Sequence, residues 1–105
     1  MKLLKSSGKP KKHNFLVFRR VVGKSMLPAL RPDKVVVASS LFRKLSPDHV
    51  VLVRHEGLDK IKRIEKISGD KVFVVGDNIR ASLDSRNFGW LPRSSVVAKV
   101  VWPRC

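Results

Sequence analysis

A serine that could act as a nucleophile lies in the segment Gly23-Lys24-Ser25-Met26-Leu27-Pro28. Glycine lets the chain turn sharply, whereas proline fixes its own φ and favours an extended residue before it, so the backbone around Ser25 has little freedom. A hydroxyl held at the end of an extended segment could attack a carbonyl carbon if a base took its proton. The same pattern also fits an ordinary polar loop, and Ser25 alone does not decide between the two.

A serine nucleophile needs a base, and the usual base is histidine. His13 lies in a basic N-terminal arm, and His49 and His55 have no carboxylate at the spacing expected of a catalytic triad. We therefore interpret all three as surface histidines and consider a lysine as the base. A lysine amine can serve at neutral pH only if its pKa is lowered by about two to three units, and burial is the available means.

Three segments, in order along the chain, resemble the motifs of the type I signal peptidase family. The segment Gly23-Lys24-Ser25-Met26-Leu27-Pro28-Ala29-Leu30 is similar to that family's nucleophile box. The segment Gly76-Asp77-Asn78-Ile79-Arg80-Ala81-Ser82-Leu83-Asp84-Ser85-Arg86-Asn87-Phe88-Gly89 is similar to its Gly-Asp-Asn…Ser-x-Asp-Ser-Arg-x-aromatic-Gly box. Between them, Ile61-Lys62-Arg63-Ile64 and Ser68-Gly69-Asp70 resemble the segment with the family's lysine base. The resemblance covers Val22 to Pro92, about two thirds of the chain.

The resemblance implies a serine endopeptidase with a Ser/Lys dyad, an acyl-enzyme mechanism and no metal or cofactor. Ser25 matches the nucleophile, Lys62 the general base, and Ser82 the hydroxyl that hydrogen-bonds the lysine amine. The backbone N–H of Ser25 would donate to the oxyanion. Asp77 and Asn78 match a turn that places the last box, and Asp84 and Arg86 match a structural ion pair. The full set of supporting residues is Gly23, Met26, Pro28, Asp77, Asn78, Asp84 and Arg86.

The expected partner is a precursor protein or peptide that loses a leader or signal peptide. A short chain without an N-terminal anchor resembles the family members that mature nickel-type superoxide dismutase, and a minimal general signal peptidase is the second interpretation. No apolar run approaches the roughly 18 to 20 residues of a membrane-spanning helix, so we expect neither a transmembrane segment nor a signal peptide. The expected location is cytoplasmic or peripheral to the membrane.

The composition indicates one small, strongly basic domain. The chain has 105 residues, with 23 Lys and Arg against 8 Asp and Glu, for a formal net charge of +15. Such a charge favours encounter with an anionic partner, and an anionic membrane surface is one candidate. Residues 1–13 are expected to be a flexible basic arm, and residues 14–105 a single β peptidase domain. The one cysteine, Cys105, excludes an intramolecular disulfide and receives no role.

Short runs rich in β-branched residues, separated by turn signals, predict strands near 15–22, 34–38, 49–54, 71–75 and 94–102. The run 34–38 is expected to be buried on both faces, and 39–46 fits either a helical turn or a loop. Ile61, Ile64 and Ile67 would suit a helix or a twisted strand. We choose a strand on the resemblance, paired in a hairpin with 71–75. Lys62 then shares the apolar face with Ile64.

The expected fold is mainly β, a small coiled sheet or partly open β-barrel, with no helix of ordinary length. It resembles the catalytic core of signal peptidases and LexA-like proteins without the inserted second domain. The alternative function is a basic β-barrel module that binds nucleic acid without catalysis, with Phe15, Phe18 and Trp90 as stacking faces. We favour the peptidase and do not expect nucleic acid as a partner.

Overall fold

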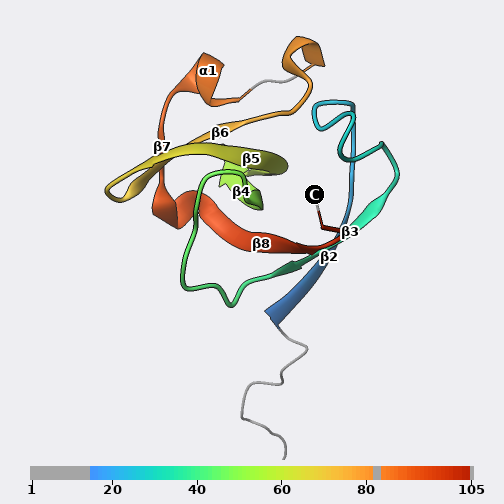
Figure 1. The fold of residues 1–105 in the computed structure, drawn as a ribbon, viewed down its shortest axis with the longest axis horizontal. Helices are drawn as coiled ribbons and strands as arrows, with labels where there is room; N and C mark the ends of the chain where they lie inside the picture. The colour runs from blue at the N-terminus through green and yellow to red at the C-terminus, as the bar shows by residue number, and fades with distance from the viewer. Residues whose placement is uncertain (1–14, 82–83, 105) are drawn as a thin grey trace, which may run out of the picture.

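A computed structural model of the chain describes residues 15–81 and 84–104. These residues form one antiparallel sheet of seven strands in the order β2-β3-β8-β4-β5-β6-β7, which coils without closing into a barrel (Figure 1). The strands are β2 (Leu16–Arg20), β3 (Val35–Ser39), β4 (Val50–His55), β5 (Leu58–Ser68), β6 (Lys71–Val75), β7 (Leu91–Pro92) and β8 (Val96–Trp102). The predicted mainly β class, with a small coiled sheet, is confirmed.

Helical structure in the described part of the chain is short. It comprises α1 (Ser85–Phe88) and single 3₁₀ turns at Ile79–Ala81 and Arg93–Ser95. None of the helices found among residues 15–81 and 84–104 is long and apolar enough to cross a membrane. The predicted basic arm with His13, the candidate residue Ser82 and the terminal Cys105 lie outside the described residues.

The apolar core consists of two clusters that lie against opposite faces of β4. Val50 and Leu52 belong to the first cluster, and Val51 and Val53 belong to the second. Strand β8 also contributes to both clusters: Val96 packs in the second, and Ala98 and Val100 pack in the first. The change of face coincides with a register shift opposite Leu52/Val53. Figure 1 shows β8 bending from below β4 toward β3. Strand β4 is therefore buried on both faces, which its continuous apolar sequence permits.

The prediction that residues 34–38 are buried on both faces is wrong. Val36 and Ala38 are buried, but Val35 on the opposite face is 44% exposed and Val37 is only partly covered. Strand β3 lies between β2 and β8, and only its inner face meets a core cluster. A run that is apolar at every position does not itself show whether core side chains will bury one face of the strand or both.

Strand β5 and its hairpin partner β6 confirm the choice of a strand for 60–67. The two strands pair from Arg63↔Val75 to Ser68↔Lys71, and the register shifts between Ile64 and Lys66. This bulge explains the spacing of three between Ile64 and Ile67, since an extra residue lets both reach the same cluster. Ile61 packs on the other cluster.

The segment between β3 and β4 is a loop and not a helical turn. Phe42 and Leu45 pack against the second core cluster, whereas Leu41 is exposed. Arg93 closes the loop from outside, because its guanidinium lies 5.5 Å from the Phe42 ring centroid and donates to the Arg43 carbonyl at 3.0 Å.

Candidate active site

Ser25 lies in a compact loop that follows β2 and is anchored at both ends. Val21 donates to the Lys34 carbonyl at 2.8 Å and accepts from the Asp33 N–H at 2.8 Å, which fixes the start of the loop. Met26 and Leu30 are completely buried in the first core cluster. Gly23 has a φ of +81°, a left-handed conformation that glycine adopts without strain. Ser25 is thus held between a glycine turn and a buried methionine, and its own side chain is partly exposed.

Lys62 is a buried base candidate in the middle of β5. Only 4% of the residue is exposed, and it lies opposite Val51 of β4 on the same face as the fully buried Ile64. Burial is the main cause that lowers the pKa of the Lys62 amine, and the charges of Lys60 and Arg86 lower it further, against an opposing effect of Asp84. The predicted sharing of the apolar face by Lys62 and Ile64 is confirmed.

One groove brings Ser25 and Lys62 together. Its volume is about 480 Å³, and its walls come from the loop after β2 on one side and the first half of β5 on the other. The lining residues are Arg20, Val21, Val22, Gly23, Lys24, Ser25, Met26, Leu58, Asp59, Lys60, Ile61 and Lys62. A partly exposed hydroxyl and a desolvated amine in one open groove are the two groups that a Ser/Lys dyad requires.

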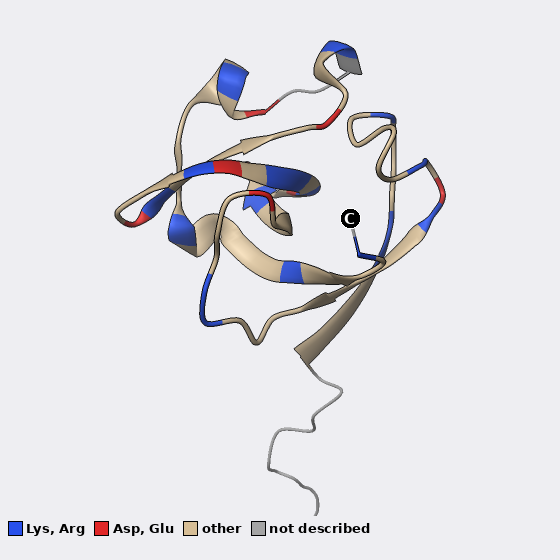
Figure 2. Ribbon diagram, in the orientation of Figure 1, with Lys and Arg blue, Asp and Glu red and all other residues tan. Residues whose placement is uncertain are grey.

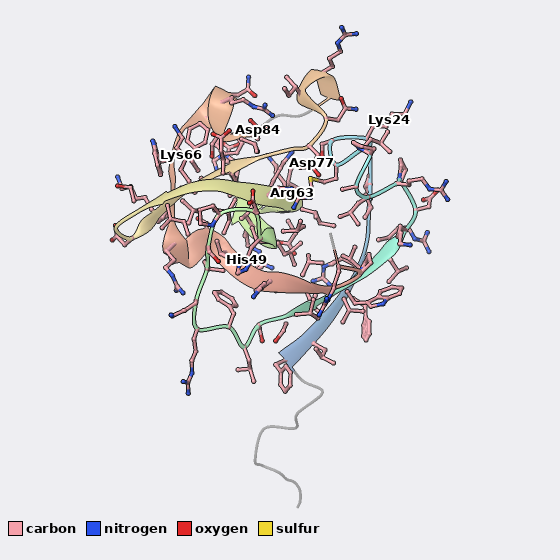
Figure 3. All side chains as sticks on the ribbon, viewed as in Figure 1. Lys24, His49, Arg63, Lys66, Asp77 and Asp84 are labelled. Carbon is pink, nitrogen blue, oxygen red and sulfur yellow. The ribbon has the colours of Figure 1, made fainter. Side chains whose placement is uncertain are left out.

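The turn after β6 clamps the Ser25 loop to the sheet. The Asn78 backbone N–H donates to the Ser25 carbonyl at 2.7 Å, and the Asn78 side-chain amide donates to the Lys24 carbonyl at 3.0 Å. The preceding Asp77 accepts two hydrogen bonds of 2.8 Å from Arg63, which also donates to the Asp48 carbonyl at 2.9 Å. Figure 3 shows Arg63 of β5 and Asp77 adjacent, near the loop with Lys24. We call Arg63, Asp77 and Asn78 the clamp.

Sequence reasoning missed Arg63. The resemblance named Asp77 and Asn78 as turn residues, but it gave Arg63 no role of its own. Its ion pair joins β5 to Asp77 in the turn after β6, and their meeting depends on the Arg63↔Val75 register. The available signal in the sequence was the acidic Asp77 in the last box, together with an arginine, Arg63, in the first strand of the predicted hairpin.

Asp84 and Arg86 form the ion pair that the resemblance implied. Asp84 is fully buried, caps α1 through the Arg86 N–H at 3.0 Å, and accepts from the Gly76 N–H at 2.7 Å. The Arg86 guanidinium contacts both carboxylate oxygens and the Gly76 carbonyl. Ser85 is buried beside it and accepts from the Val74 N–H at 2.9 Å. These contacts fix α1 to the end of β6, next to the clamp.

Of the remaining predicted residues, Gly23 and Met26 line the groove, whereas Pro28 borders a separate shallow hollow with Asp77 and Asn78.

Neither His49 nor His55 is among the groove-lining residues. His49 accepts from the Ser46 N–H at 3.2 Å, and burial lowers the pKa of its imidazole. His55 stacks on Phe88 with ring centroids 4.2 Å apart. Both histidines are therefore engaged away from Ser25.

Comparison with known proteins identifies relatives. Residues 53–104 match the family described as signal peptidase, peptidase S26. The mitochondrial ATP-independent inner membrane protease subunit 1a of Arabidopsis thaliana is 35% identical in an alignment 115 residues long. This alignment covers 79% of this chain and 68% of the relative. Subunit 1b of the same organism is 31% identical over 119 residues, covering 85% and 70%. The family match includes Lys62 and the last box, and the two alignments extend over most of the chain.

Proposed function

The chain belongs to the signal peptidase family, peptidase S26, and from this we propose that it is a serine endopeptidase with Ser25 as nucleophile and Lys62 as general base. Its substrate is a precursor protein from which it removes a leader or signal peptide. The observation that carries the proposal is the shared groove, in which the one partly exposed serine of the anchored loop faces the strand of a buried lysine.

The chemistry follows from the protonation state of Lys62. In its neutral form the amine accepts the proton of the Ser25 hydroxyl while Oγ forms a bond to the scissile carbonyl carbon. The oxyanion accepts a hydrogen bond from the Ser25 backbone N–H, and the Lys62 ammonium returns its proton to the leaving amine as the peptide bond breaks. Water then adds to the acyl-enzyme and loses a proton to Lys62. As the ester bond between the acyl carbon and Ser25 Oγ breaks, the Lys62 ammonium returns this proton to Oγ, which releases the acid and restores the hydroxyl and the neutral amine.

The first half of β5 offers a place for an extended substrate. Residues 58–62 pair with β4, whereas the described pairing of β5 with β6 begins only at Arg63. The other edge of 58–62 borders the groove. A substrate segment that added to this edge as a strand would satisfy its backbone groups and carry its scissile bond past Lys62 toward Ser25.

We propose two further roles, one from the resemblance and one from the charge of the chain. We assign to the Ser82 hydroxyl the task of orienting the Lys62 amine, because a lysine side chain has four rotatable bonds and burial alone does not aim its lone pair. We assign to the basic arm, residues 1–13, contact with an anionic membrane surface, since it carries five lysines and no acid. Binding of the protein to anionic vesicles should weaken with salt, and salt-insensitive binding would contradict this role of the arm.

The test compares Ser25→Ala and Lys62→Met with matched controls on the same protein. Ser94 is an exposed serine, and Lys66 is an exposed lysine of the same strand, so Ser94→Ala and Lys66→Met remove the same groups elsewhere. Cleavage is measured by mass spectrometry of a peptide library, and protein N-termini are compared in cells with parent or Ser25→Ala protein. Both site variants should lose cleavage, with losses that do not add in the double variant. Cleavage by Ser25→Ala at the parent's rate would contradict the assignment.

A further inference from the structure

The groove that holds Ser25 and Lys62 is lined by positive charge. Four of its lining residues are basic, namely Arg20, Lys24, Lys60 and Lys62, and one is acidic, namely Asp59. Figure 2 shows basic stretches of β5 on either side of an acidic one. If Lys62 is neutral when it acts as the base, three cations still face the space that a substrate occupies.

The one acid of the groove is already paired. Asp59 accepts from Arg54 at 2.7 and 3.2 Å, and Arg19 lies 3.7 Å from the same carboxylate. The hydrogen bond with Arg54 is the main cause that lowers the pKa of Asp59, so the carboxylate stays ionised and shares its charge with two arginines. Asp59 therefore does not neutralise the three cations of the groove.

Lys60 is the cation best placed to meet a substrate side chain. It lies two residues before Lys62 on the same face of β5, about 7 Å along the strand, which is the length of two residues of an extended peptide. Its amine lies 5.2 Å from the ring centroid of Phe88, which is itself stacked on His55. The cation–π contact with Phe88 restricts the Lys60 side chain and so lowers the entropic cost of fixing it, while Lys60 remains one of the residues that line the groove.

We propose that the enzyme prefers substrates with an acidic side chain within about two residues of the scissile bond, and that Lys60 is the residue that receives this carboxylate. The inference rests on the proposed function, because it assumes that the peptide runs along residues 58–62 of β5. A carboxylate near Lys62 would by itself stabilise the protonated amine and oppose its action as a base. A carboxylate paired with Lys60 is neutralised, so the substrate can be acidic without disabling the base.

The experiment compares peptides of one cleavable sequence that carry Asp, Asn or Lys at a single position near the scissile bond. The parent should cleave the Asp peptide with a kcat/KM about tenfold or more above the isosteric Asn peptide, and the ratio should shrink as salt rises. Lys60→Gln should reduce the ratio to within about twofold of one, and Lys60→Glu should favour the Lys peptide. Lys71→Gln removes the same charge from an exposed site on β6 and should keep the parent's ratio.

The ratio, and not the rate, is the decisive quantity, because Lys60 also influences Lys62 and its loss changes cleavage of every peptide. The same peptides are also bound to Ser25→Ala protein and followed by fluorescence anisotropy, which separates recognition from chemistry. Tighter binding of the Asp peptide without any cleavage by the parent would remove the proposed function and keep the recognition by Lys60. Equal values for Asp and Asn peptides in both assays, or a preference that survives Lys60→Gln, would overturn the inference.

Discussion

The backbone N–H of Asn78 donates a 2.7 Å hydrogen bond to the carbonyl oxygen of Ser25. This contact joins the proposed nucleophile directly to the turn after β6, and the Asn78 side chain repeats the link one residue earlier, at Lys24. Since Arg63 adjoins Lys62 on β5 and holds Asp77, the clamp connects the strand of the base to the loop of the nucleophile. The relative position of the two groups is therefore set by three polar residues that need not touch a substrate.

Removal of the Asn78 side-chain amide should lower activity more than stability. Asn78→Asp keeps the size of the side chain but cannot donate to the Lys24 carbonyl, so the loop loses one of its two links. We expect kcat/KM to fall by about ten- to a hundredfold, because a small displacement of Ser25 is costly, while the free energy of unfolding falls by about 1 kcal/mol. Ile79→Ala, at the adjacent residue that is 72% exposed, is the control. An Asn78→Asp enzyme as active as the parent would show that the backbone link suffices.

The ion pair between Arg63 and Asp77 should stabilise the fold measurably. Both side chains are largely covered, with exposures of 19% and 17%, and both hydrogen bonds are 2.8 Å long. A double-mutant cycle with Arg63→Ala and Asp77→Ala, followed by urea unfolding, should give a coupling energy of about 1 to 3 kcal/mol.

The chain offers a matched control for this pair. Arg54 and Asp59 also form a two-bond contact, but Arg54 is 57% exposed. Water screens such a pair, so its coupling energy should be the smaller of the two. Equal coupling energies would mean that coverage of Arg63 and Asp77 adds nothing to their interaction.

The sheet could be predicted from the sequence because turn signals and β-branched runs are local properties. The burial of each strand face could not be predicted in the same way, since it depends on the position of the strand in the sheet. Val35 and Val51 are equally apolar, yet the first is 44% exposed and the second fully buried, because β4 lies between two clusters and β3 borders one. The bulge between Ile64 and Lys66 was likewise hidden, and it gave β5 a spacing that a helix would share.

For the site, motif resemblance named residues and the ion pair of Asp84 with Arg86, but not the contacts of the clamp. Lys62 was expected on the apolar face with Ile64, and that geometry is confirmed by their common burial. The pairing of Arg63 with Asp77 depends on strand register, and the contact of Asn78 with Ser25 joins segments 53 residues apart. Such contacts follow from the coiling of the sheet in three dimensions and have no local signal in the chain.

Ser82 and Ser85 should respond differently to replacement by alanine, although they lie in the same box. Ser82→Ala should lower kcat by about ten- to a thousandfold with little change in KM or thermal stability, because it removes the group that we propose to orient Lys62. Its pH profile should still rise through one basic group. Ser85→Ala leaves the buried Val74 N–H without its acceptor and should cost about 1 to 3 kcal/mol of stability. A Ser82→Ala enzyme whose loss of activity merely follows unfolding would make Ser82 a structural residue.

Lys62 should reduce the stability of the fold at neutral pH, and its replacement should reveal this cost. Burial lowers the pKa of the amine in the folded protein, whereas in the unfolded chain it has the ordinary value of about 10.4. Between the two pKa values the unfolded chain binds more protons, so the free energy of unfolding rises with pH across that window. Below the folded pKa the full cost remains.

Lys62→Met replaces the amine by an apolar group of similar length and should stabilise the protein by about 1 kcal/mol at neutral pH, while activity is lost. The difference between parent and variant, measured by urea unfolding at a series of pH values, should shrink as pH approaches about 10.4, because the parent then unfolds without taking up a proton. Lys66→Met, at an exposed position of the same strand, is the control for the loss of a lysine from β5. If Lys62→Met is less stable than the parent at every pH, contacts of the amine outweigh its desolvation, and burial alone does not hold the base in its neutral form.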